Sequence, residues 1–141
     1  MDVRMLNNYV GYALRRAQSA VFTDFIDTLA ELKLRPGQFT VLTVIDQNPG
    51  TSQSHVSVAL GIQKANFVAT ITDLVQRGYV VRHRSTSDGR SYELELTARG
   101  KRLLERAAAL QAVHEARIAE RLGARGREQL LELLVRLAEP A

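Results

Sequence analysis

The chain of 141 residues contains no cysteine and no tryptophan, and only 6% of its residues are aromatic. Without cysteine, disulfide bonds, thiolate metal sites and cysteine-based redox sensing are excluded. No stretch approaches the roughly 20 apolar residues that span a bilayer, and the N-terminus lacks a cationic region followed by an apolar core. We therefore expect a cytoplasmic protein without a membrane contact.

The sequence also lacks the combinations of residues on which enzymes depend. Its three histidines, His55, His83 and His114, lie far apart in separate predicted segments. There is no glycine-rich phosphate loop and no strand-turn-helix serine motif, and a helical turn from His114 leads to no second metal ligand. The sequence thus predicts no catalytic residue, no metal site and no cofactor.

Apolar residues recur at helical spacing along most of the chain. The first such segment, about 3–32, predicts one long amphipathic helix. Pro36 suits the first turn of a second helix, which Asn48-Pro49-Gly50 closes, and Thr51 or Ser52 can cap a short third helix ending at Leu60. Further helices are predicted over 63–76, 98–122 and about 127–138, the last two separated by breaks at Gly123 and Gly126.

Between the helices at 63–76 and 98–122, the apolar period changes from helical spacing to two. Residues 79–84 and 92–96 alternate in polarity, and Asp88-Gly89 supplies a turn between them. A hairpin after a short helix and a longer helix is the layout of a winged helix-turn-helix. The predicted fold class is mainly α (α+β), with that unit at about 36–97.

The net positive charge coincides with this hairpin. Residues 77–102 hold seven basic and three acidic residues, a net charge of +4, which equals the net charge of the whole chain. A basic surface beside a helix-turn-helix is typical of nucleic-acid binding. The alternative is a solvated hairpin whose charged edges discourage strand pairing.

The two ends of the chain hold more apolar surface than one small domain can cover. The leucine-rich last helix has an apolar face too wide for an exposed surface, and the first helix is longer than the predicted winged unit. We expect residues 1–32 and 98–141 to be dimerisation helices of a homodimer that reads a pseudo-palindromic DNA site. The alternative is a monomer whose ends fold back on each other.

In its order of features the chain resembles the MarR (multiple antibiotic resistance regulator) family of winged-helix transcription factors. The resemblance spans essentially the whole chain and rests on Leu60-Gly61-Ile62, Lys64, Leu74, Arg77-Gly78-Tyr79-Val80, Asp88-Gly89-Arg90-Ser91 and Leu94-Glu95-Leu96-Thr97-Ala98-Arg99-Gly100.

The resemblance implies that the helix at 63–76 enters the major groove and that Arg90 at the hairpin tip reaches the minor groove or its phosphates. Asp88 would brace the hairpin through Arg82 or Arg84, or be a plain turn residue. Val68 and Ala69 are apolar where relatives carry a small polar residue and an arginine, so phosphate contacts and DNA shape should carry much of the affinity. The predicted DNA-binding residues are Ser52, Ser54, Lys64, Ala65, Asn66, Thr70, Arg82, Arg84 and Arg90.

Members of the family are often repressors that release double-stranded DNA when a small effector binds between the dimer helices and the DNA-binding lobe. The resemblance implies an aromatic acid, a phenolic compound or an aromatic acyl-CoA here. The candidate effector-binding residues are Tyr9, Tyr12, Arg15, Arg16, Phe22, Phe25 and Phe39, although each can equally be ordinary core or surface. The alternative functions are a non-specific DNA-organising protein and a winged-helix module that binds protein.

Overall fold

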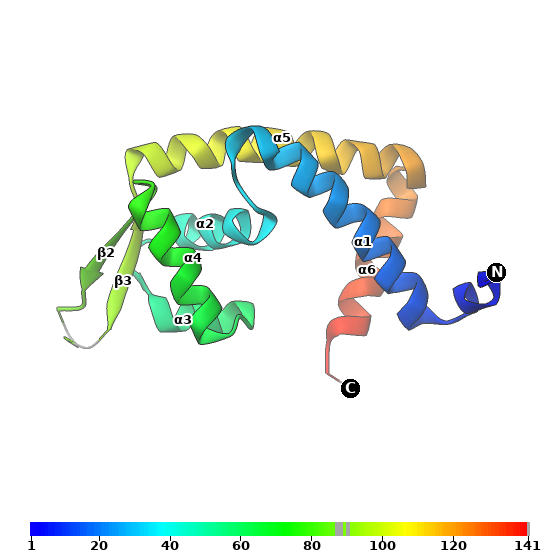
Figure 1. Cartoon of the computed structure of the whole chain (residues 1–141), viewed down its shortest axis with the longest axis horizontal. Coiled ribbons are helices and arrows are strands. Elements are labelled where there is room, and N and C mark those ends of the chain that lie inside the picture. Colours follow the sequence, from blue (N-terminus) through cyan, green and yellow to red (C-terminus); the bar gives the residue numbers. More distant parts are fainter. Residues whose placement is uncertain (87–88, 90, 141) are drawn as a thin grey trace.

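The structure, a computed structural model, describes residues 1–86, 89 and 91–140. Figure 1 shows two parts joined by the long helix α5 (Ala98–Leu122), which runs along the top of the molecule. One part holds three short helices and a hairpin, and the other holds the N-terminal and C-terminal helices. Asp88 and Arg90, both predicted to act in the hairpin tip, lie outside the described residues.

The predicted single helix over 3–32 is wrong in detail. The chain forms a 3-10 helix, η1 (Arg4–Asn8), then α1 (Val10–Leu29) and a second 3-10 turn, η2 (Ala30–Leu32). Tyr9 separates η1 from α1 because its backbone is extended, with φ −108° and ψ 127°. Lys33 ends η2 in the left-handed region at φ 53°, which redirects the chain into the next helix. The spacing of apolar residues continues across Tyr9, so it did not indicate this break.

The helix-turn-helix forms as predicted. Pro36 opens α2 (Pro36–Gln47), and the Ser52 hydroxyl caps α3 (Gln53–Leu60) by accepting the backbone N–H of His55 at 3.0 Å. Gly61 adopts φ 63° and turns the chain into α4 (Lys64–Gln76). The α4 helix buries Phe67, Ile71 and Leu74 and thereby joins the core.

The predicted hairpin is β2 (Val80–Arg84) paired antiparallel with β3 (Tyr92–Leu96), in a register that sets Arg82 opposite Leu94. A third strand, β1 (Thr51–Ser52), pairs with the other edge of β3 and was not predicted. Two residues are too few to show a period of two, so their pairing depends on β3 being beside them. One core lies beneath these elements, and its fully buried members include Leu29, Leu42, Ile45, Val56, Phe67, Ile71, Leu74, Val80 and Leu94.

Thr97 connects the sheet to α5. Its hydroxyl accepts the N–H of Gly100 at 3.0 Å and donates to the carbonyl of Gly78 at 2.6 Å, and its own N–H donates to the carbonyl of Tyr79. These bonds confirm the predicted cap and fix the start of α5 against the turn after α4. The last helix, α6, spans Ala124–Ala138, so Gly123 ends α5 but the predicted break at Gly126 is wrong. One glycine inside a leucine-rich helix costs less than the exposed turn that would replace it.

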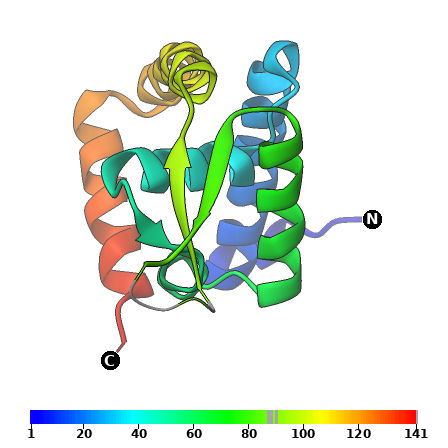
Figure 2. The same cartoon turned by 90° about the vertical axis from the view of Figure 1, so that its left-hand side faces the viewer.

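The two ends of the chain carry large exposed apolar faces. Tyr9, Val10, Leu14 and Phe22 on the N-terminal side are each more than 40% exposed, and α6 buries none of its leucines. Figure 2 shows α6 and α1 on opposite sides beneath α5, so they do not cover each other. The two faces stay uncovered within one chain, which argues against the alternative of a monomer whose ends fold back on each other. None of the helices in the described part of the chain has the length and apolar content to cross a membrane.

We predict that Gly100→Ala destabilises the fold. Gly100 is buried, and a β-carbon there would overlap the carbonyl oxygen of Tyr79, a backbone atom that cannot move aside cheaply. We expect the free energy of unfolding in urea to fall by about 1–3 kcal/mol. Gly37→Ala is the control, because a β-carbon at Gly37 meets nothing within 4 Å. Equal stability of the two variants would contradict the close packing at Gly100.

Candidate nucleic-acid interface

The side of α4 that faces away from the core is exposed and carries three of the predicted contact residues, Lys64, Ala65 and Asn66. Lys64 is the only basic residue of α4 and stands in its first turn. The amide of Asn66 lies 3.5 Å from the side-chain oxygen of Gln63, a weak contact that leaves it able to meet a base edge. This side can therefore enter a groove without removing apolar side chains from the core.

Thr70, a predicted DNA-binding residue of α4, is only partly exposed, as is Asp73 one turn further along. The hydroxyl of Thr70 donates to the carbonyl of Asn66 at 3.0 Å, and the residue is half-buried on the flank that faces α2. Asp73 is also half-buried and accepts hydrogen bonds from Gln38 and Arg77. A period of 3.6 does not show how far a neighbouring helix covers each flank, and the contact of Thr70 with DNA stays a prediction.

The two serines near the start of α3 differ in their roles. Ser52 is half-buried and its hydroxyl is engaged in the cap, whereas Ser54 is exposed. Ser54 lines a hollow of about 380 Å³ between α3 and α4, together with Lys64 and Val68. Of the two, Ser54 has the side chain available for a phosphate oxygen.

The hairpin presents its arginines around one aromatic ring. The guanidinium carbons of Arg82 and Arg84 lie 5.4 and 5.9 Å from the ring centre of Tyr92, and Arg84 donates to the carbonyl of Gly89 at 2.9 Å. Tyr92 was not predicted to take part. His83 on the same strand lies 3.8 Å from the carboxylate of Glu95. The Tyr92 ring and the Gly89 carbonyl hold the guanidinium groups of Arg82 and Arg84 in place near the hairpin tip.

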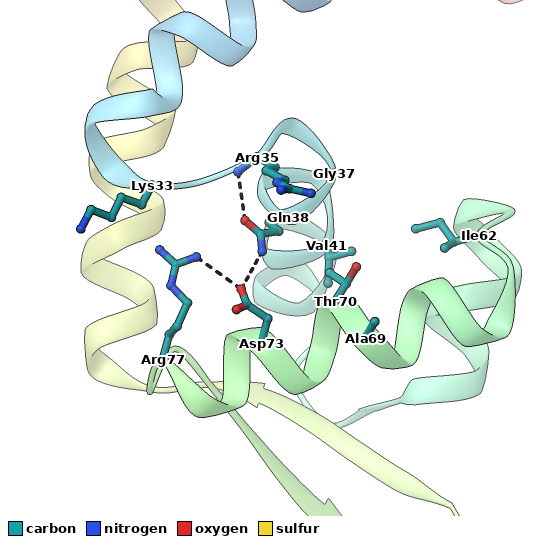
Figure 3. A pocket seen from close by; sticks show the side chains of 10 residues that line it. All are labelled: Lys33, Arg35, Gly37, Gln38, Val41, Ile62, Ala69, Thr70, Asp73 and Arg77. Carbon is teal, nitrogen blue, oxygen red and sulfur yellow. Dashed lines mark hydrogen bonds and ion pairs between the residues drawn. The ribbon is translucent and has the colours of Figure 1, made fainter.

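A chain of hydrogen bonds joins α4 to the turn between α1 and α2 (Figure 3). The amide of Gln38 donates to Asp73 at 2.8 Å while its oxygen accepts the backbone N–H of Arg35 at 3.0 Å. Arg77 lies 3.4 Å from both Asp73 and the carbonyl of Leu32. We call Gln38, Asp73 and Arg77 the α2–α4 latch. It stands in a groove of about 630 Å³ between the two helices.

The seven candidate effector-binding residues do not form one cluster. Phe25 and Phe39 meet edge to face with ring centres 5.7 Å apart, and Arg15 lies over the ring of Tyr12 at 5.4 Å. Arg16 donates to Asn7 at 3.1 Å. Tyr9, just before α1, and Phe22 on α1 are both exposed. The structure thus brings two of the aromatics together at the junction with α2 and leaves the others along α1.

A buried histidine completes that junction, and the sequence did not indicate it. Nδ1 of His114 lies 2.6 Å from Oδ2 of Asp24, and its ring stacks on Phe25 with centres 4.8 Å apart. Arg117 donates to the same oxygen at 3.0 Å and to the hydroxyl of Thr28. We expected His114 to be isolated. The structure shows instead that it fixes α5 against α1. The two partners are 90 residues apart, so no local pattern links them.

The pKa of Asp24 is lower than its ordinary value of 3.8, because His114 and then Arg117 donate hydrogen bonds to the carboxylate. Within residues 1–86, 89 and 91–140, no three His, Asp or Glu side chains gather as a metal ion would need. The cluster at His114 is thus one carboxylate shared by two donors.

Comparison with known proteins identifies the family. A family model described as MarR family matches residues 32–91. The transcriptional regulatory protein for the hcr operon of Thauera aromatica is 34% identical over 91% of this chain and 78% of its own length. An HTH-type transcriptional repressor of Mycobacterium tuberculosis is 30% identical over 91% of this chain and 92% of its own. The chain belongs to the MarR family.

Solved structures agree with this assignment. The transcriptional repressor CouR bound to a 23-mer DNA duplex is 44% identical, with a TM-score of 0.95 over 99% of both chains. CouR bound to p-coumaroyl-CoA is 42% identical, with a TM-score of 0.91 over 100% of this chain and 99% of the other. The predictions of a winged-helix fold and of a ligand-responsive, DNA-binding transcriptional repressor are confirmed.

We predict that the α2–α4 latch orients the recognition helix α4. Gln38→Glu keeps the oxygen that accepts from Arg35 but sets a carboxylate against Asp73. We expect urea unfolding to show a loss of about 1 kcal/mol, with weaker DNA binding. Adding Asp73→Asn returns an amide donor to the pair and should recover both properties. A double variant no better than Gln38→Glu alone would show that the contact is unimportant.

A second prediction concerns Asp24. Since the pKa of its carboxylate is lowered in the folded chain, the stabilisation it provides is present above 3.8 and is lost as the pH falls through the folded-state pKa. Asp24→Asn should therefore be less stable than the parent at neutral pH, and the difference should shrink in acid. Urea unfolding at several pH values measures this, with Asp27→Asn, an exposed position one turn along α1, as control. A difference that does not change with pH would contradict the assignment.

Proposed function

We propose that the chain acts in the cytoplasm as a homodimeric repressor that binds a pseudo-palindromic operator and leaves it when an aromatic acyl-CoA binds. The observation that carries the proposal is the exposed side of α4 beside a basic hairpin, in a chain that matches CouR over almost its whole length. Such a surface suits a major groove flanked by phosphates.

The dimer is proposed from the apolar faces of the terminal helices. Exposed leucines along α6 and exposed apolar residues on α1 lie at the end of the molecule away from α3 and α4 (Figure 1). A second copy related by a twofold axis would cover both faces and present two copies of α4 to the same side of a duplex. Residues 1–32 and 98–141 are accordingly proposed as the dimerisation helices.

The effector class is proposed from the junction of α1, α2 and α5. Phe25, Phe39 and His114 provide aromatic surface there, and Arg15 and Arg16, which lie further toward the N-terminus of α1, are the candidate cations for an anionic group. CouR, which has the same fold, is known bound to p-coumaroyl-CoA. The effector can release DNA only if it has different affinities for the conformations that bind and do not bind the operator. We infer binding without catalysis, since the family and its neighbours are transcriptional regulators.

The test is fluorescence anisotropy on the DNA just upstream of the gene, with a scrambled duplex for comparison, over a range of salt concentrations. We expect preference for the upstream DNA, an affinity that falls steeply with salt, and release by p-coumaroyl-CoA but not by CoA alone. Equal affinity for both duplexes would favour a DNA-organising protein, and binding to neither would favour a protein-interaction module.

Arg84→Ala tests the role of the hairpin in this assay. Because Arg84 is a phosphate-contact candidate, its loss should weaken binding to all duplexes and lower the slope of log affinity against log salt by about one per subunit. The control is Arg106→Ala, an exposed arginine on α5, on the opposite side of the lobe from α3. An unchanged salt slope in Arg84→Ala would remove this arginine from the interface.

A further inference from the structure

The exposed surface of α4 carries three small or aliphatic side chains, Ala65, Val68 and Ala69, beside the polar Lys64 and Asn66. Ala69 lines the groove between α2 and α4, and Val68 lies on the flank that faces α3. Thr70 and Asp73 lie on the flank that faces α2, where both line the groove between the two helices. The largest of these three apolar side chains is Val68, which is 38% exposed.

The surroundings of Val68 indicate what it contacts. It lines the hollow between α3 and α4 together with Lys64, Ser54 and a second exposed aliphatic residue, Val58, which is 80% exposed. Lys64 and Ser54 are suited to phosphate oxygens, so the hollow combines an apolar surface with backbone-contacting groups. It lies on the winged lobe, away from the apolar faces of α1 and α6, which makes DNA its occupant rather than a second subunit.

The major groove offers one apolar group to such a surface. Guanine, cytosine and adenine present donors and acceptors there, whereas thymine adds its C5-methyl group. We propose that Val68 is a specificity-determining residue that packs against a thymine methyl in each half-site, with Ala65 and Ala69 small enough to let the helix approach closely. This inference rests on the proposed function, because it requires that α4 enters the major groove.

The test begins with selection of tight-binding duplexes from a pool with a randomised centre. Each thymine of the selected duplex is then replaced in turn by deoxyuridine, which removes the methyl group and keeps the base-pairing edge. We expect affinity to fall about fourfold at one position in each half-site, and about fifteenfold when both are replaced. The salt slope should not change, since no phosphate contact is altered.

Val68→Ala supplies the decisive comparison. It should bind the thymine duplex more weakly than the parent chain and lose its sensitivity to deoxyuridine at that position, as coupled partners do. Val81→Ala is the matched control, since Val81 is 37% exposed on β2 and should keep the full sensitivity. Both side chains are exposed, so neither change removes core packing.

The outcomes separate the two proposals. If selection enriches no sequence, operator reading fails and the methyl contact fails with it. If a sequence is enriched but deoxyuridine has no effect at any position, or has the same effect on Val68→Ala as on the parent chain, the methyl contact alone is overturned. Sensitivity that disappears only in Val68→Ala would establish it.

Discussion

The burial of Phe67, Ile71 and Leu74 sets the rotation of α4, and the DNA-facing surface depends on that rotation. Each fully buried side chain of this size contributes roughly 1.5–3 kcal/mol, so turning the helix to expose one of them would be costly. The same three contacts leave Ala65, Val68 and Ala69 on the outside. The burial of these three side chains thus determines which residues of α4 are available to contact bases in the proposed complex.

Affinity and base reading are divided between different elements. The cations are concentrated in the hairpin, where Tyr92 and the carbonyl of Gly89 hold Arg82 and Arg84 in place, while α4 carries only Lys64. Phosphate contacts of this kind give strong, salt-dependent binding without sequence preference. In the proposed function, discrimination would come from Asn66 and Val68 of α4, together with the sequence-dependent shape of the duplex.

Two polar clusters hold the helices in place, one at the winged unit and one among the terminal helices. The α2–α4 latch joins the recognition helix to the turn after α1, and Asp24 joins α1 to His114 and Arg117 of α5. Phe25 and Phe39 lie at the same junction. The fixed packing of these helices thus depends on partners that lie 35 and 90 residues apart in the sequence.

Local chemistry determined much of the fold. Several features depend only on a few neighbouring residues: the helix periods, the caps at Ser52 and Thr97, the turn at Gly61 and the alternation of 79–84 and 92–96. The sequence therefore predicted α2 to α5, the hairpin and the MarR family. It did not predict the break at Tyr9, strand β1, the latch or the pairing of Asp24 with His114. Those features depend on partners distant in the sequence, such as residues 35 and 90 positions apart, and only packing brings such partners together. The sequence by itself therefore determined which elements form and what charge they carry. The tertiary structure decided which side chains of α4 remain exposed to meet DNA, because neighbouring helices cover its flanks unequally.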